Sequence, residues 1–136
     1  DPLWSRGLGD VYKRQGFLTG TVDRTTSFAD GDIRGTIPRF SEENRAANEA
    51  LVGHVASLAE SKEASPGQIA LAWLLAREPW IVPIPGTRRT SRIAENAGAT
   101  TVALSADELA DLDQLADRVG VQGDRYNPQQ MSFVDR

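Results

Sequence analysis

Residues 80–96 read WIVPIPGTRRTSRIAEN. The apolar run at 81–84 has the length of a buried strand, and the Pro-Gly-Thr sequence at 85–87 forms a turn that ends it. A basic segment with three arginines follows and leads into a helix that we expect at 90–98. This order predicts a strand, a tight turn and a helix, with the arginines grouped at the turn.

The start of the expected helix is suited to an anion. Its first backbone N–H groups have no partner within the helix, and the helix dipole places a partial positive charge there. Arg88 and Arg92 add planar guanidinium groups that can donate two hydrogen bonds at once to a phosphate. The stretch therefore predicts a phosphate-binding turn, and the alternative for these arginines is a solvated helix start.

The composition is typical of a soluble globular protein. The chain has 136 residues, of which 40% are hydrophobic and 25% charged, and its net charge of −4 argues against a protein that binds nucleic acid. It has no cysteine, which excludes disulfides and thiolate chemistry. We find no apolar run long enough for a membrane span and no signal-peptide pattern, so we predict a cytoplasmic protein without a membrane segment.

Two helices are expected before the turn. Ser41 is a typical N-cap, and apolar residues at three- and four-residue steps, such as Leu51 and Val55, predict a helix with one apolar stripe. Ser65 precedes a proline and has Gln68 three residues later, which is the pattern of a capping box. The residues that follow are apolar all round, so we expect this second helix to be buried on most sides.

Two helices are also expected after the turn. The helix at 90–98 is predicted to end at Gly98 as a C-cap. Ser105 and Glu108 form a second capping-box pattern, which predicts a last amphipathic helix that ends at Gly120. Pro83 lies within the expected strand and removes a backbone donor, which by composition alone indicates an edge strand.

Two motifs of this chain, SPGQIALAW at 65–73 and IPGTRR with RIAEN at 84–96, together resemble the C-terminal region of the aldo-keto reductases. Those enzymes are NADPH-dependent (β/α)8 barrels. The resemblance extends from about Gly16 to about Tyr126. It implies an α/β fold class, with residues 16–136 as the C-terminal portion of a TIM barrel that is mostly helical here. It also implies that the one clear strand, at about 80–84, is the eighth strand of the barrel in spite of its proline.

Residues 1–15 show neither helical nor strand periodicity and nothing that the resemblance would place before the GFLTG sequence at 16–20. We interpret them as a leader that is either non-native sequence or a naturally disordered N-terminus.

The resemblance implies a set of cofactor-binding residues. Contacts to the 2′-phosphate of NADP(H) are expected from the turn and the helix start, contacts to the adenine from one turn further along the helix, and contacts to the pyrophosphate from the loop near residue 16. The residues concerned are, in that order, Gly86, Thr87, Arg88 and Arg92; Glu95 and Asn96; and Gly16 and Leu18. Arginine beside a 2′-phosphate predicts NADP(H) rather than NAD(H).

No catalytic residue and no metal site are expected in this chain. The family's acid is a tyrosine helped by a lysine, an aspartate and a histidine, all from the N-terminal half of the barrel. Tyr126, Lys62 and His54 match none of those positions, and we interpret His54 as a residue at the edge of an apolar stripe.

The predicted function is therefore NADPH-dependent reduction of a small aldehyde or ketone to an alcohol by a parent protein to which this chain contributes the adenosine site. One alternative is a non-catalytic NADP(H)-binding regulator on the same fold, such as a channel-subunit-like sensor. Another is a helical interaction module with a basic loop.

Overall fold

The structure of the chain is a computed structural model. It describes residues 18–19, 22–23, 25–87, 89–119, 122–124 and 126–131. The leader at 1–15, the predicted cofactor-site residue Gly16 and the predicted end of the last helix at Gly120 lie outside these ranges. None of the helices in the described part of the chain is long and apolar enough to cross a membrane.

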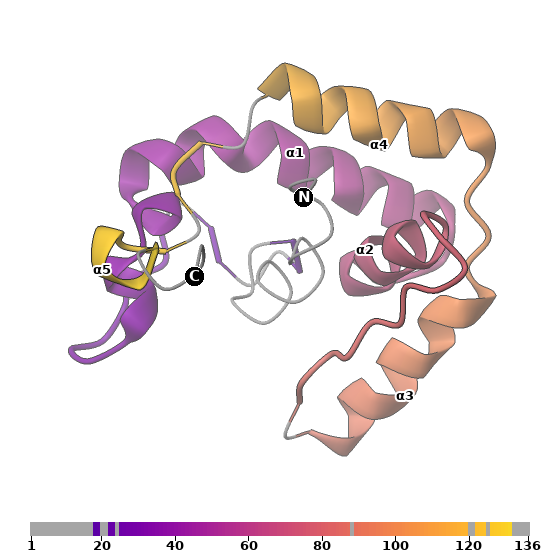
Figure 1. Cartoon of the computed structure of the whole chain (residues 1–136), viewed down its shortest axis with the longest axis horizontal. Helices are drawn as coiled ribbons and strands as arrows, with labels where there is room; N and C mark the ends of the chain where they lie inside the picture. The colour runs from indigo at the N-terminus through magenta and orange to yellow at the C-terminus, as the bar shows by residue number, and fades with distance from the viewer. Residues whose placement is uncertain are drawn as a thin grey trace.

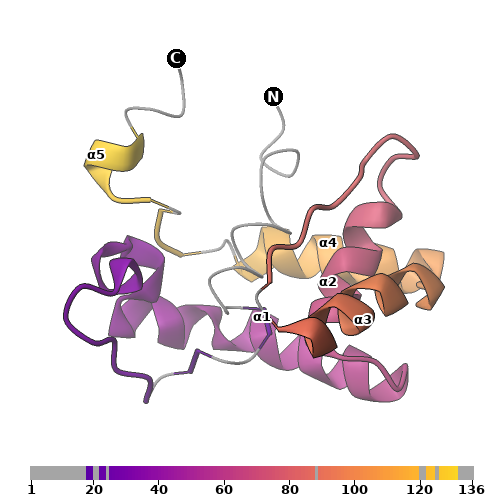
Figure 2. The same ribbon diagram turned by 90° about the horizontal axis from the view of Figure 1, so that it is seen from below.

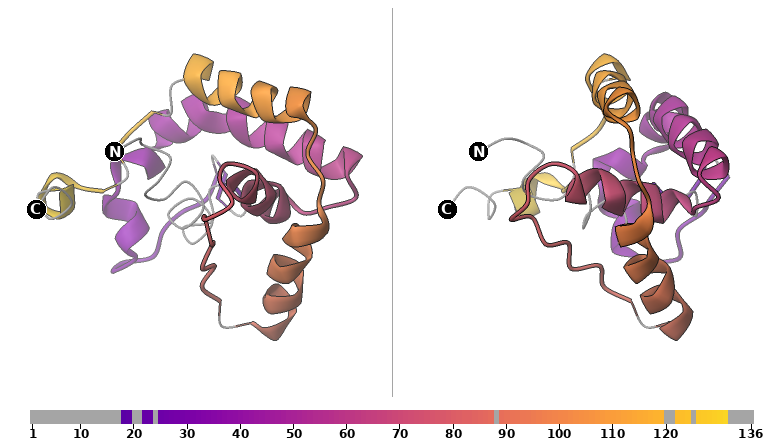
Figure 3. Two further views of the ribbon diagram at one scale, coloured as in Figure 1. Left: turned by 45° about the vertical axis from the view of Figure 1, so that its right-hand side comes forward. Right: turned by 90° about the vertical axis from the view of Figure 1, so that its right-hand side faces the viewer.

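The described residues form helices and contain no strand (Figure 1). The α-helices are α1 (Glu42–Ser61), α2 (Pro66–Leu75), α3 (Thr90–Gly98), α4 (Ala106–Val119) and α5 (Pro128–Met131). Short 3₁₀ turns are η2 (Ile33–Thr36), η3 (Pro38–Phe40) and η4 (Ala99–Thr101). The long helix α1 is the centre of the arrangement: α4 runs beside it in both views of Figure 3, and α2 packs against it.

The three helix starts predicted from serine are confirmed. Ser41 Oγ accepts a hydrogen bond from the backbone N–H of Asn44 at the start of α1. Ser65 and Gln68 form the complete capping box of α2. At α4, the backbone N–H of Ser105 donates to Glu108 Oε2 over 2.7 Å, while Glu108 N donates to Ser105 Oγ over 3.2 Å.

The apolar core lies between α1, α2 and α4. It contains Leu51, Val55 and Ala59 of α1, Ile69 and Ala70 of α2 and Leu112 of α4, together with Leu18, Val22, Ile37 and Phe40 from the N-terminal segments. Six of the ten residues of α2 are buried, as its apolar sequence predicted. On the polar side of the α2–α4 contact, Trp73 Nε1 donates to Asp113 Oδ1 over 2.9 Å, and the same carboxylate pairs with Arg77.

The strand predicted at about 80–84 is wrong. Residues 81–87 have no regular secondary structure, and Figure 2 shows this segment as a bare tube between α2 and α3. The side chains of Val82 and Ile84 are 79% and 81% exposed. A strand exists only by pairing its backbone with a neighbour, and the described residues offer no second strand; Pro83 moreover has no N–H to donate.

The helix predicted at 90–98 is confirmed as α3, but Gly98 is the last residue of the helix and Ala99 is its C-cap. Gly98 keeps helical backbone angles, with φ −60° and ψ −17°, and the chain continues directly into η4. A Cβ at this position would come within 2.7 Å of Gln68 Nε2. The absence of a side chain at Gly98 therefore lets the Gln68 amide approach α3 closely.

A buried asparagine attaches the C-terminal segment to α1. Asn48 is 0% exposed; its Nδ2 donates to the carbonyl of Gln122 and its Oδ1 accepts from the backbone N–H of Gln122, both over 2.9 Å. Arg39 Nε donates to the carbonyl of Gly123 over 3.1 Å. These contacts satisfy polar groups that would be costly to bury alone. They also hold residues 122–123 against α1 and η3.

Candidate functional site

The turn before α3 is stabilised by its own threonine. Thr87 Oγ1 accepts a hydrogen bond from the backbone N–H of Arg89 over 3.1 Å, a local side-chain-to-backbone contact of the kind that stabilises turns. Arg89 has extended backbone angles and is the N-cap of α3, but no side chain caps the helix there. The N–H of Arg92 donates to the carbonyl of Arg89 over 3.1 Å, so the N–H groups of Thr90 and Ser91 are the ones available to an outside acceptor or to water.

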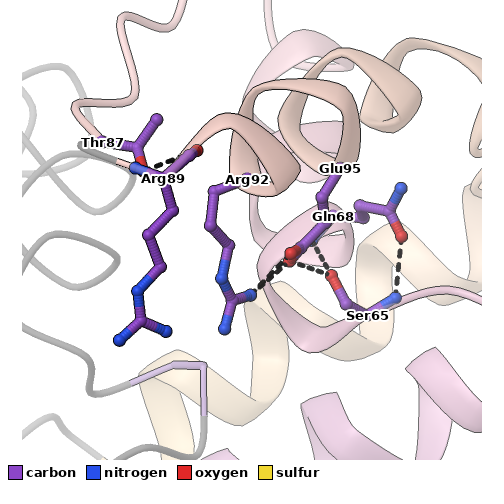
Figure 4. Close-up of polar contacts among 6 residues, drawn as sticks. All are labelled: Ser65, Gln68, Thr87, Arg89, Arg92 and Glu95. Carbon is purple, nitrogen blue, oxygen red and sulfur yellow. Dashed lines mark hydrogen bonds and ion pairs between the residues drawn. The ribbon is translucent and has the colours of Figure 1, made fainter.

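Two arginine side chains extend side by side from the start of α3. Arg89 is the N-cap of α3 and Arg92 lies on its first turn. Figure 4 shows the two side chains running in the same direction from the helix, below the turn that holds Thr87. Their positive charges therefore lie together at the positive end of the α3 dipole.

Arg92 is held by a carboxylate on the next turn of α3. Its Nη1 donates to Glu95 Oε1 over 2.8 Å and to Glu95 Oε2 over 2.6 Å. The Glu95 side chain is 22% exposed. Both hydrogen bonds run through Nη1, so the Nε and Nη2 edge of the guanidinium faces away from this pairing and can donate to a second acceptor.

Glu95 is in turn attached to α2. Ser65 Oγ donates to Glu95 Oε1 over 2.8 Å, a contact between residues 30 positions apart in the sequence. The chain of contacts therefore runs from the capping box of α2 through Glu95 to Arg92 (Figure 4).

The structure brings together part of the predicted cofactor site. Gly86 and Thr87 are exposed at the turn, and Arg92, Glu95 and Asn96 are half-buried on the first two turns of α3. Their predicted contacts with NADP(H) stay predictions. Arg88 and Gly16, which complete the predicted set with Leu18, lie outside the described residues.

Leu18 is placed elsewhere. It is 6% exposed in the apolar core and lines a small pocket of about 50 Å³ with residues of α1, α2 and α4. The walls of this pocket are almost wholly apolar, which makes it a packing feature of the core rather than a site for a charged ligand.

Arg89 and Ser65 were not predicted as site residues from the sequence. Arg89 could have been found because it belongs to the same basic segment as Arg88 and Arg92. Ser65 could not, because its contact with Glu95 depends on how α2 and α3 pack. In the part of the chain that the structure describes, no three His, Cys, Asp or Glu side chains gather as metal ligands would.

Comparison with known proteins agrees with the sequence motifs. Residues 14–117 match the sequence model of the Aldo/keto reductase family. The chain is 40% identical over 114 residues to an aldo-keto reductase of Schizosaccharomyces pombe whose name specifies NADP(+), covering 84% of this chain and 34% of that protein. It is 37% identical over 111 residues to an aldo-keto reductase of Strobilurus tenacellus, covering 82% of this chain and 33% of the relative. The chain spans about a third of the length of these relatives.

Proposed function

Because the chain belongs to the aldo/keto reductase family, we propose that it contributes the adenosine end of an NADP(H) site to an oxidoreductase. The family implies a TIM-barrel-type α/β fold, in which phosphate sites lie in the loops after the last strands and use the N-terminus of a short helix. The turn at 85–87 followed by the nine-residue helix α3 supports this assignment, because it supplies the loop and the short helix.

The donors at the start of α3 fit a phosphate. The observation that carries the proposal is the pair of parallel side chains, Arg89 and Arg92, beside the Thr87 hydroxyl and the uncapped N–H groups of α3 (Figure 4). Guanidinium and backbone N–H donors favour a doubly charged, acceptor-only group, and the adenosine 2′-phosphate is such a group. The name of the Schizosaccharomyces pombe relative supports NADP(H) as the cofactor.

The contribution of this chain is binding and orientation. Arg89 joins Gly86, Thr87, Arg88 and Arg92 in holding the 2′-phosphate, and Glu95 and Asn96 accept and donate hydrogen bonds at the adenine edge. Gly16 approaches the pyrophosphate, whereas Leu18, which is buried in the apolar core, is left out of the site. The nicotinamide of the bound cofactor supplies the hydride for a small aldehyde or ketone. No residue of this chain has a catalytic role in this proposal, and the proton donor belongs to another part of the complete enzyme.

The proposal predicts that Arg92→Ala in the complete enzyme weakens NADPH binding and spares NADH binding. One or two charge-assisted hydrogen bonds are lost with the guanidinium, so we expect the dissociation constant for NADPH to rise by about 10- to 100-fold. NADH lacks the 2′-phosphate, so its dissociation constant should change little. Titration of cofactor fluorescence with both dinucleotides measures the preference.

Arg118→Ala is the matched control. Arg118 is an exposed arginine of α4 whose Nε donates to the carbonyl of Gln114 over 3.2 Å, so its removal lowers the net charge equally without touching the turn. We expect this variant to retain the wild-type preference. An Arg92→Ala enzyme that still prefers NADPH as strongly as the wild type would contradict the proposed site.

A further inference from the structure

We infer that Ser65 is a positioning residue for the cofactor preference: from the cap of α2 it fixes Glu95, and Glu95 fixes Arg92 toward the phosphate. The inference rests on the proposed function, in which Arg92 binds the 2′-phosphate. Ser65 itself touches no part of the cofactor in this scheme and acts only through the two side chains on α3.

The hydroxyl of Ser65 makes two contacts at once. Its oxygen accepts from the backbone N–H of Gln68 over 3.2 Å, which caps α2, and its proton is donated to Glu95 Oε1 over 2.8 Å. A hydroxyl has a single proton, so donation to Glu95 uses its whole donor capacity. The cap fixes the position of Ser65 Oγ at the start of α2. The hydrogen bond from Ser65 therefore holds the Glu95 carboxylate of α3 against α2.

The carboxylate passes this constraint to Arg92. Oε1 of Glu95 accepts from both Ser65 Oγ and Arg92 Nη1, so one oxygen atom joins the two side chains. A solvent-exposed arginine side chain that makes no other contact loses considerable rotamer freedom when it binds an anion. In this structure the side chain is already ordered by Glu95, with its Nε and Nη2 edge directed elsewhere, so less freedom remains to be lost on binding.

A second contact between the same helix ends supports the arrangement. Gln68 Oε1 accepts from the backbone N–H of Ser65 over 2.8 Å and so completes the capping box. The amide of the same side chain lies against Gly98, where an added Cβ would force the amide to move. Both side chains of the capping box thus contact α3: Ser65 contacts Glu95, and Gln68 lies against Gly98. The capping box therefore caps α2 and also fixes the position of α3 against it.

The test is the cofactor preference of Ser65→Ala in the complete enzyme. We expect the dissociation constant for NADPH to rise by about 3- to 10-fold, the range of one lost hydrogen bond, and that for NADH, which shares the adenine but lacks the 2′-phosphate, to rise by a smaller factor. Ser65→Thr keeps a hydroxyl that can cap and donate, and it should restore the wild-type preference. Ser65→Gly loses the hydroxyl but is almost as good an N-cap, so it gives the same readout if the alanine variant does not fold.

Two further variants separate positioning from helix capping. Ser105→Ala removes the equivalent capping-box serine of α4, whose partner is Glu108. It should lower the stability of the protein without changing the preference for NADPH. In a Glu95→Ala background, Ser65→Ala should cause no further loss of preference, because the link between Ser65 and Arg92 is already absent.

The outcomes distinguish this inference from the proposed function. If Arg92→Ala loses the preference and Ser65→Ala and Ser65→Gly keep it, the positioning role is overturned and the phosphate site stands. The positioning role is equally overturned if Ser65→Ala weakens NADPH and NADH binding by the same factor, which is the result of a purely structural cap. If Arg92→Ala itself keeps the preference, the phosphate site is overturned.

Discussion

At the scale of single residues, two glycines with nearly the same backbone conformation have different surroundings. Gly31 and Gly123 have φ of +86° and +83°, in the left-handed region that side chains disfavour. A Cβ on Gly31 would meet nothing within 4 Å. On Gly123 it would lie 2.7 Å from the backbone N of Arg39 and 2.6 Å from Asn44 Nδ2. Gly123 is therefore required both by its conformation and by the close approach of η3.

We predict that alanine at these two positions has unequal effects. Gly31→Ala should lower the free energy of unfolding by about 1 kcal/mol, the cost of the conformation alone. Gly123→Ala should cost more and should loosen the attachment of the C-terminal segment, so that the amide of Gln122 exchanges faster with solvent. Denaturant unfolding and amide hydrogen exchange of the complete protein measure the two effects. Equal costs, with the Gln122 amide still protected, would contradict the close approach to Arg39.

At the scale of elements, one ion pair joins the end of α1 to the start of α4. Lys62 Nζ lies 2.8 Å from Glu108 Oε1, while Glu108 also completes the capping box with Ser105. The hydrogen bond from Lys62 lowers the pKa of Glu108 below its ordinary value of 4.5, and the backbone N–H of Ser105 adds to this effect. A carboxylate with a lowered pKa in the folded state stabilises the protein above its unfolded pKa, and this contribution is lost as the pH falls through the folded pKa.

We therefore predict that the contact between α1 and α4 weakens below about pH 4.5. Glu108→Gln retains a capping-box residue but has no charge to titrate. Its melting temperature should be lower than that of the wild type at pH 7, and the difference should shrink as the pH is lowered toward pH 3. Asp107→Asn, at an exposed neighbouring position, is the control. A difference between Glu108→Gln and wild type that is the same at pH 7 and pH 3 would refute the role of the charge.

The elements that could be predicted are those whose signals are local. Ser65 with Gln68 and Ser105 with Glu108 are three residues apart, so the sequence alone identifies both capping boxes. The contact between Asn48 and Gln122 joins residues 74 positions apart, and no local pattern indicates it.

The candidate site divides in the same way. Its turn and its arginine-bearing helix were predicted, because Gly86, Thr87 and Arg92 belong to one short stretch. The link from Glu95 to Ser65 was not, since it is a product of helix packing. The end of α3 at Gly98 was predicted, but the cap was not: Ala99 is the C-cap, and the contact of Gly98 with Gln68 depends on how α2 and α3 pack.

At the scale of the whole molecule, the apolar segment at 80–84 stands apart from the helical core. Trp80, Val82 and Ile84 are exposed although their composition is that of a buried strand. The family fold explains the composition, because a barrel strand is covered by its neighbours on both edges and both faces. A closed barrel of this type needs eight strands, and the described residues contain none.

We predict that the 136-residue chain expressed alone has no carbonyl reductase activity and self-associates. Exposed apolar side chains in one segment are a common cause of association. Consumption of NADPH with an aldehyde substrate and size-exclusion chromatography are the measurements. Val82→Lys should reduce the association by placing a charge in the segment. A monomeric chain that oxidises NADPH would show that this prediction is wrong.

The two prolines at 83 and 85 leave one edge of this segment without their backbone N–H donors. In an extended chain the backbone groups of alternate residues point to the same side. Pro83 and Pro85 are alternate residues, so both missing N–H groups fall on one edge, while Val82 and Ile84 keep their donors on the other. A strand of a second molecule can therefore form a full set of backbone hydrogen bonds only along the edge that carries the N–H groups of Val82 and Ile84. A fibril grows by stacking strands on both edges of every segment, so this stretch can end such a stack but cannot propagate it.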